Sequence, residues 1–248
     1  MDMTKQAIET LINADIKPYE HIVEHGDLLF AVDKDGNVGQ IKPKLTTLAD
    51  EPLQLRNLSS LVDYIKSDLD RKGEKLYVHI MDNRKVAVKS ILQRDGSREV
   101  LAVAQPQVPN LDFNYYRDSE EFLIDLNAKF VNEYDRANLI SFAGNVKEED
   151  ARQTSDDGFS QKTTVKRGVA SVQEEIVPNP VKLTPYRTFH EIKQVPSEFI
   201  FRMSHGPKFG LFEADGGAWI NETILLIEEY LVAALNDEIE SGKIIILS

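Results

Sequence analysis

Short apolar runs separated by turn residues are the first pattern in the chain. Two such runs, 28–32 and 38–41, flank an Asp35-Gly36 turn, which is typical of a β-hairpin. Upstream of them, apolar residues of 3–13 gather on one side of a predicted short helix. The N-terminal pattern therefore predicts a helix followed by a hairpin.

Helical spacing then gives way to strand spacing. Between 59 and 71 the apolar positions recur at the three- and four-residue spacing of a helix, and Gly73 is expected to end that helix. The connections between the strand candidates that follow are too short for parallel crossovers, so they predict an antiparallel meander. These candidates are 76–81, 85–92 and 99–104.

The centre of the chain carries two helical patterns. Asp118 is a good N-cap residue with Glu121 three positions later, which is the spacing of a capping box. A second helix is predicted over 136–152, and the polar run 153–158 is the clearest break in the chain.

After that break the pattern predicts strands and one long helix. The strand candidates are 159–167, 182–190, 199–204 and 208–212, of which the last two form a hairpin. The helix spans 218–240, and its apolar surface is wider than a single-sided helix needs. A final strand is predicted over 243–247.

These elements predict an α+β fold of antiparallel sheets with packed helices. The long C-terminal helix is expected to pack on the C-terminal sheet. We expect four segments: an N-terminal extension (1–47), a helix with a meander (48–110), a central helical pair (111–155) and a β-rich part with the long helix and final strand (156–248).

Composition narrows the class of protein. The 248 residues contain no cysteine, which excludes disulfides, thiolate nucleophiles and Cys-ligated zinc. No apolar stretch is long enough for a membrane span, and no signal peptide is visible, so a cytoplasmic location is expected. The net charge of −12 disfavours nucleic acid as a partner without excluding a local basic face.

One motif matches a metal site. His21, Glu24 and His25 fit H-x-x-E-H, in which two histidines on one helical face bind zinc and the glutamate activates water. The nearby Pro18 and Gly26 leave at most a short helix, so an exposed turn or short helix is the favoured interpretation. A metal-dependent hydrolase remains an alternative, and no cofactor is predicted.

Basic residues concentrate on the predicted meander. They are a candidate nucleic-acid site, and the competing interpretation is that they discourage edge-to-edge aggregation of strands. The residues are Arg84, Lys85, Lys89, Arg94 and Arg98.

The C-terminal apolar surface suggests a homo-oligomer. The long helix and the last strand carry more apolar side chains than one modest domain can cover. The predicted interface residues are Trp219, Leu226, Tyr230, Ile244 and Ile246.

Three stretches give the chain a family resemblance. They are the helix around 61–65 with its meander, the segment 115–130 leading to 138–142, and the β-rich region 182–212. In their order and pattern the chain resembles the uncharacterised YfdQ-like family of phage and prophage proteins. The resemblance implies a phage-derived product of unknown role, in early phage functions or counter-defence.

No catalytic pattern emerges, so the sequence favours a non-enzymatic, self-assembling binding or structural protein. A nucleic-acid accessory protein of phage recombination is the second candidate, and the metal-dependent hydrolase is the third.

Overall fold

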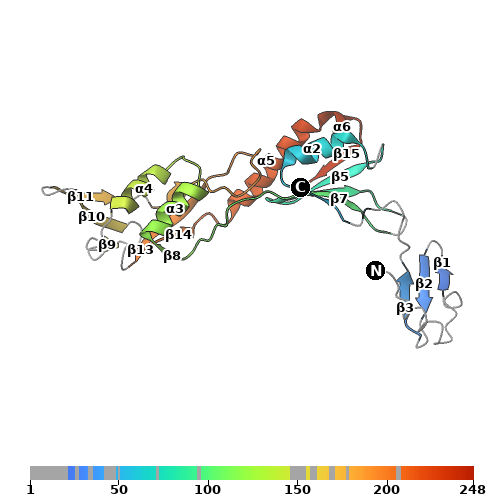
Figure 1. Ribbon diagram of the computed structural model, residues 1–248, viewed down its shortest axis with the longest axis horizontal. Helices are drawn as coiled ribbons and strands as arrows, with labels where there is room; N and C mark the ends of the chain where they lie inside the picture. The colour runs from blue at the N-terminus through green and yellow to red at the C-terminus, as the bar shows by residue number, and fades with distance from the viewer. Residues whose placement is uncertain are drawn as a thin grey trace.

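The computed structural model confirms the α+β fold. It describes residues 22–25, 28–32, 36–41, 49, 51–70, 73–93, 96–145, 155–156, 161–167, 171–176, 179–204 and 208–248. Most of these residues belong to two bodies, called here the central body and the distal body, which lie end to end (Figure 1).

The central body is a five-stranded sheet covered on one side by helices. Its strands are β4 (Leu53–Leu55), β5 (Leu76–Asp82), β6 (Lys85–Ser90), β7 (Val100–Ala104) and β15 (Ile244–Leu247), in the order β15-β5-β6-β7-β4. The predicted meander β5–β7 is confirmed as antiparallel, whereas β15 and β4 add to its two edges in parallel. Its helices are α2 (Leu58–Ser67), α5 (Ala218–Ala234) and α6 (Asn236–Glu240), which lie above the strands in Figure 1.

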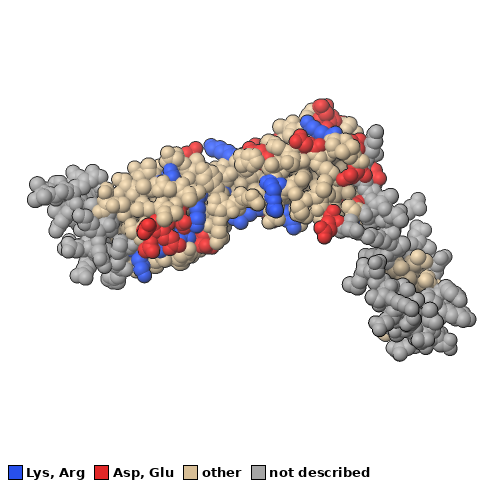
Figure 2. Space-filling model, viewed as in Figure 1, with Lys and Arg blue, Asp and Glu red and all other residues tan. Residues whose placement is uncertain are grey.

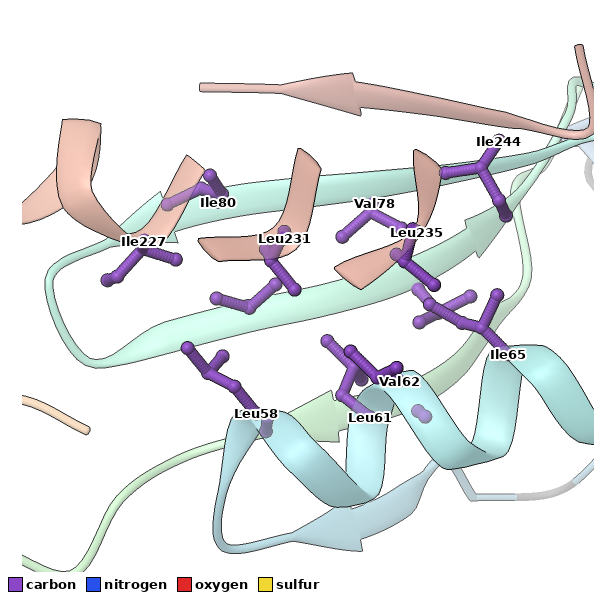
Figure 3. Packing of buried hydrophobic residues seen from close by; sticks show 14 of the residues in the cluster. Leu58, Leu61, Val62, Ile65, Val78, Ile80, Ile227, Leu231, Leu235 and Ile244 are labelled. Carbon is purple, nitrogen blue, oxygen red and sulfur yellow. The ribbon is translucent and has the colours of Figure 1, made fainter. Parts of the chain in front are cut away.

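An aliphatic core joins these helices to the sheet. In Figure 3, Leu61 of α2 and Leu231 of α5 point toward the same strands from two different helices. Asn57 caps α2, because its side-chain oxygen accepts a hydrogen bond from the Ser60 N–H at 2.7 Å. The helix ends at Asp68, whose φ of 53° is left-handed, and so it ends before the predicted Gly73.

The distal body is a four-stranded sheet packed against two helices. Its strands are β12 (Val181–Leu183), β13 (Ser197–Ser204), β14 (Lys208–Glu213) and β8 (Tyr116–Asp118), in the order β12-β13-β14-β8. The helices α3 (Ser119–Lys129) and α4 (Arg136–Asn145) complete a core rich in phenylalanine. The predicted Asp118 cap is confirmed, since its carboxylate accepts from the Glu121 N–H at 2.8 Å.

Two small sheets lie outside these bodies. One consists of β1 (Ile22–His25), β2 (Leu28–Val32) and β3 (Val38–Ile41), and it contains the predicted hairpin. The other consists of β9 (Ser155–Asp156), β10 (Gln161–Arg167) and β11 (Ser171–Ile176). The helix predicted at 3–13 lies outside the described residues.

The chain passes between the two bodies at 105–115 and at 214–217, and a third segment, 184–196, leaves the distal sheet and returns to it; we call 184–196 the crossing segment. It was predicted as the continuation of a strand over 182–190, but regular pairing ends at Leu183. Phe189 and Ile192 of this segment are buried in the central core. Between the two cores, the guanidinium of Arg187 lies 3.7 Å from the ring centroid of Trp219 on α5. We call this contact region the joint.

The two bodies do not coincide with the four segments expected from the sequence. The predicted C-terminal segment (156–248) contributes to both bodies, because α5, α6 and β15 return to the sheet formed by 51–104. The long helix therefore covers the N-terminal meander and not the C-terminal sheet. Its wide apolar surface has a physical reason, since it contacts α2, β5 and β15.

Candidate functional site

The described part of the H-x-x-E-H segment, Ile22–His25, is the strand β1. Glu24 and His25 lie on β1, paired with Leu29 and Leu28 of β2. Successive side chains of a strand point to opposite faces, so this backbone does not align motif residues as a helix would. His21 lies outside the described residues. The described part of the chain holds no group of three His, Asp or Glu residues placed to bind a metal ion.

The predicted basic residues separate into two places. Lys85 and Lys89 lie on β6, four residues apart and therefore on the same face of the sheet. That face is opposite to the one that carries Val86 and Val88 of the central core. Arg84 lies at the β5–β6 turn, where its Nε donates to the Arg187 carbonyl at 3.2 Å. Arg94 lies outside the described residues.

None of the described helices covers the second face of the central sheet in Figure 1, and we call this face the open face. Tyr77 and His79 point to it from β5, since Leu76, Val78 and Ile80 fill the helix-covered core. Ladder pairing places Tyr77 opposite Lys89 and His79 opposite Ala87. The same face continues onto β15 through Ile245 beside Tyr77 and Leu247 beside His79.

Two contacts organise the polar side chains of this face. Lys89 Nζ lies 2.8 Å from His79 Nδ1, and an ammonium group can only donate, so the imidazole accepts and is neutral. Burial lowers the pKa of His79, and the positive charge of Lys89 lowers it further. Arg98 places its guanidinium 5.2 Å from the Tyr77 ring centroid. The open face therefore combines two rings with three cationic side chains, those of Lys85, Lys89 and Arg98.

The residues predicted to form an oligomer interface lie mostly in the chain's own core. Ile244 is buried in the central core, and Trp219 is buried beneath Arg187. The other three pack partly buried against the same core; they are Leu226, Tyr230 and Ile246. The exposed apolar side chains are their neighbours, including Ile245 (44% exposed) and Leu247 (43% exposed).

The strand β15 forms one edge of the central sheet, and none of the strands that the structure describes pairs with its outer side. Leu76 N donates to the Lys243 carbonyl at 2.9 Å, so the backbone groups of Lys243 face β5. Because these groups alternate in direction along a strand, those of Ile244 and Ile246 point outward. The edge has the sequence Ile-Ile-Ile-Leu without a charged residue or a proline.

A pocket of about 440 Å³ lies beside the joint. It is bounded by Arg56 and Asn57 before α2, the segment 106–109, and Tyr186 and His190 of the crossing segment. The nearby N-terminus of α2 is already occupied, since the Glu191 carboxylate accepts from the Ser59 N–H at 2.8 Å. Figure 2 shows Lys and Arg side chains gathered where the central body meets the distal body.

Arg187 is the most perturbed cation at the joint. It is 3% exposed, and burial lowers its pKa to about 10, partly opposed by Asp215 and Glu213. Its Nη2 donates to the Val195 carbonyl at 3.2 Å. These contacts give Arg187 a structural role in holding the two bodies together.

Comparison with known proteins returned no match: no family model, no curated protein and no solved structure is similar to the chain at the level required. The resemblance to the YfdQ-like family stays a prediction. Among the described residues, no helix has the length and apolar character needed to cross a bilayer.

Sequence reasoning did not identify His79, Ile245 and Leu247 as surface residues. The period-two pattern of β5 separates Tyr77 and His79 from Leu76, Val78 and Ile80, so it could have placed the two rings on one face. For the uniformly apolar β15 no such signal exists, and only the position of α5 and α6 decides which side chains are exposed.

Proposed function

We propose that this chain is a non-enzymatic binding and assembly protein that self-associates through the free edge of β15. The YfdQ-like resemblance makes a phage or prophage origin part of the proposal. The observation that carries it is an uncharged edge strand with outward backbone groups and two exposed aliphatic side chains, Ile245 and Leu247.

The other edges of the two larger sheets support this choice. The edge of β12 is covered by the loop after α3, where Asp135 N donates to the Lys182 carbonyl and Asp135 accepts from Lys182 N. The edge of β8 is three residues long and contains Arg117 and Asp118. The edge of β4 is equally short and follows Pro52. Natural sheets use these devices to block pairing. The strand β15 is also short, at four residues, but it contains neither a charged residue nor a proline.

The partner that fits this edge is the strand β15 of a second copy of the chain. Two identical strands pair antiparallel across a twofold axis perpendicular to the sheet, which gives a closed dimer. The outward groups of Ile244 then pair with those of Ile246 in the second copy, and Ile245 lies opposite itself. Directly opposite side chains lie on the same face, so both open faces lie on one side of the dimer.

The test exploits the absence of native cysteine. At a non-hydrogen-bonded antiparallel pair the Cα atoms are about 4.5 Å apart, which is within the range of a disulfide. Ile245→Cys should therefore give a disulfide-linked dimer on a non-reducing gel under mild oxidation. Leu225→Cys is the matched control, because Leu225 is equally aliphatic and 58% exposed but lies on α5 away from the edge.

A mass measurement completes the experiment. Light scattering at micromolar concentration should give the dimer mass for the native chain and the monomer mass for Ile245→Lys, whose ammonium groups would oppose each other across the axis. Since Ile245 is exposed in the single chain, Ile245→Lys should keep the native circular dichroism spectrum, and its thermal midpoint should no longer depend on protein concentration. A monomer mass for the native chain, together with equal crosslinking of the two cysteine variants, would overturn the proposal.

A further inference from the structure

We propose that the open face of the central sheet binds single-stranded nucleic acid. In this site Tyr77 and His79 stack on bases, while Lys85, Lys89 and Arg98 contact phosphates. The inference goes beyond self-association and does not rest on it, because every residue of the site belongs to one copy of the chain.

The spacing of the two rings fits an extended strand. Tyr77 and His79 are two residues apart on β5, which separates them by about 6.6 Å along the strand. That is roughly twice the 3.4 Å rise between stacked bases of a duplex strand. Two consecutive bases of an unstacked strand can therefore each meet one ring. Stacking of this kind tolerates any base, since every base has a π face.

The charge of the face differs in sign from that of the chain. The net charge of the whole protein is −12. On the open face, ladder pairing places Lys89 opposite Tyr77 and Ala87 opposite His79, with Val103 opposite Ala87 on the next strand. The residue opposite Lys85 is Asp82, whose carboxylate accepts a hydrogen bond from the Arg84 N–H at 2.6 Å. Arg98 adds a third cation above Tyr77. A local cationic surface of this kind attracts phosphates even on an acidic protein.

The shape of the face selects single strands over a duplex. The major groove of DNA admits one helix or a two-stranded ribbon, whereas the face of a five-stranded sheet is too broad to enter it. An acidic protein as partner could use the cations alone, whereas the partly exposed rings of Tyr77 and His79 add a stacking surface that nucleic-acid bases can use. The rings and the cations together favour a strand that presents both bases and phosphates.

Arg98 is placed to respond to the ligand. Its side chain is exposed and lies over the Tyr77 ring, where an incoming base would stack. Movement of the guanidinium to a neighbouring phosphate would free the ring, and it would replace a cation–π contact with a charge-assisted hydrogen bond.

The experiment is a fluorescence anisotropy titration of the full chain with a labelled oligothymidine of about 12 nucleotides at low salt. Tyr77→Ala should weaken binding by about tenfold, and Tyr77→Phe should restore it. Lys85→Glu and Arg98→Glu should also weaken binding. Lys66→Glu is the matched control, because Lys66 is an exposed lysine on α2, on the helix-covered side.

Two further readouts separate stacking from general attraction. Lys85→Ala should reduce the slope of log affinity against log salt by about 0.7, as expected for one phosphate contact on a single strand. Inorganic polyphosphate, which has no bases, should compete weakly. No binding at low salt, native affinity in Tyr77→Ala, or an equal loss in Lys66→Glu would each overturn the inference, as would equal competition by polyphosphate.

Discussion

In the central body three helices cover one face of a five-stranded sheet with aliphatic side chains, whereas in the distal body two helices cover a four-stranded sheet with phenylalanine rings. The distal rings meet in edge and tilted arrangements, such as Phe142 against Phe201 with centroids 5.8 Å apart. The exposed edges of the two sheets also differ. One edge of the larger sheet is the uncharged strand β15, while the distal sheet has a loop-covered edge and a short charged one.

We interpret this difference as a division of roles, in which the distal body contributes stability and the central body contacts partners. In the distal body the large phenylalanine side chains are buried in the core. The central body carries Tyr77, His79, the cationic side chains and the outer edge of β15 at its surface, so both proposals place binding there. The following predictions test that division, from the largest expected effect to the smallest.

Truncation in either core should be the most damaging change. Phe201→Ala should lower the free energy of unfolding by about 3–5 kcal/mol and Leu231→Ala by about 2–5 kcal/mol, because both side chains are almost completely buried. Urea denaturation followed by circular dichroism measures both. We expect both variants to move one shared transition, since the joint couples the bodies. Two transitions, each moved by only one variant, would show that the bodies unfold independently.

Loss of the arginine at the joint should rank second. Arg187→Met keeps most of the side-chain volume but removes the bonds to the Val195 carbonyl and to Ser197 Oγ, and the stacking on Trp219. The expected loss is about 2–4 kcal/mol, with a broadened or divided unfolding transition. Calorimetry detects such a division. A sharp transition with native stability would contradict the role assigned to Arg187.

The two N-caps allow a matched comparison of the bodies. Asn57→Ala in the central body and Asp118→Ala in the distal body should each cost about 1 kcal/mol, because each removes an oxygen that accepts from a backbone N–H. Asn57→Asp and Asp118→Asn keep an acceptor oxygen and should recover most of the loss. Urea midpoints of the four variants check this prediction.

The smallest effect should be a pH dependence located in the central body. The pKa of His79 is lowered in the folded chain, so the unfolded chain binds a proton first as the pH falls below about 6.5. Stability should then decrease between that value and the lower folded pKa. Comparing the native chain with His79→Gln, at about pH 7.5 and about pH 5, isolates this contribution. An identical pH response of the two proteins would contradict it.

Local elements of the fold could be predicted because their signals are local. The meander, the Asp118 cap and the 28–32/38–41 hairpin follow from periodicity and turn chemistry within a few residues. The three-residue strands β4 and β8 were missed, since they are too short to show a period. Their existence depends on pairing with strands from elsewhere in the chain.

The return of the C-terminal elements to the central sheet could not be predicted. About 140 residues separate β5 from α5, and nothing in the helix itself identifies which sheet it covers. For the same reason, the candidate site could be predicted only in part. Lys85, Lys89 and Arg98 were recognised as a group, but the exposure of Ile245 became evident only once the covered face was known.

The joint has a mechanical consequence. Asn83 and Arg84 donate to the Arg187 carbonyl, Thr188 donates to the Asn83 carbonyl, and Trp219 stacks on the Arg187 guanidinium. Contacts from the β5–β6 turn and from α5 thus resist both bending and twisting between the two bodies. In the proposed dimer, such bracing would turn two chains into a single stiff beam with a distal body at either end. The distance between the two distal bodies would then be fixed in the assembly.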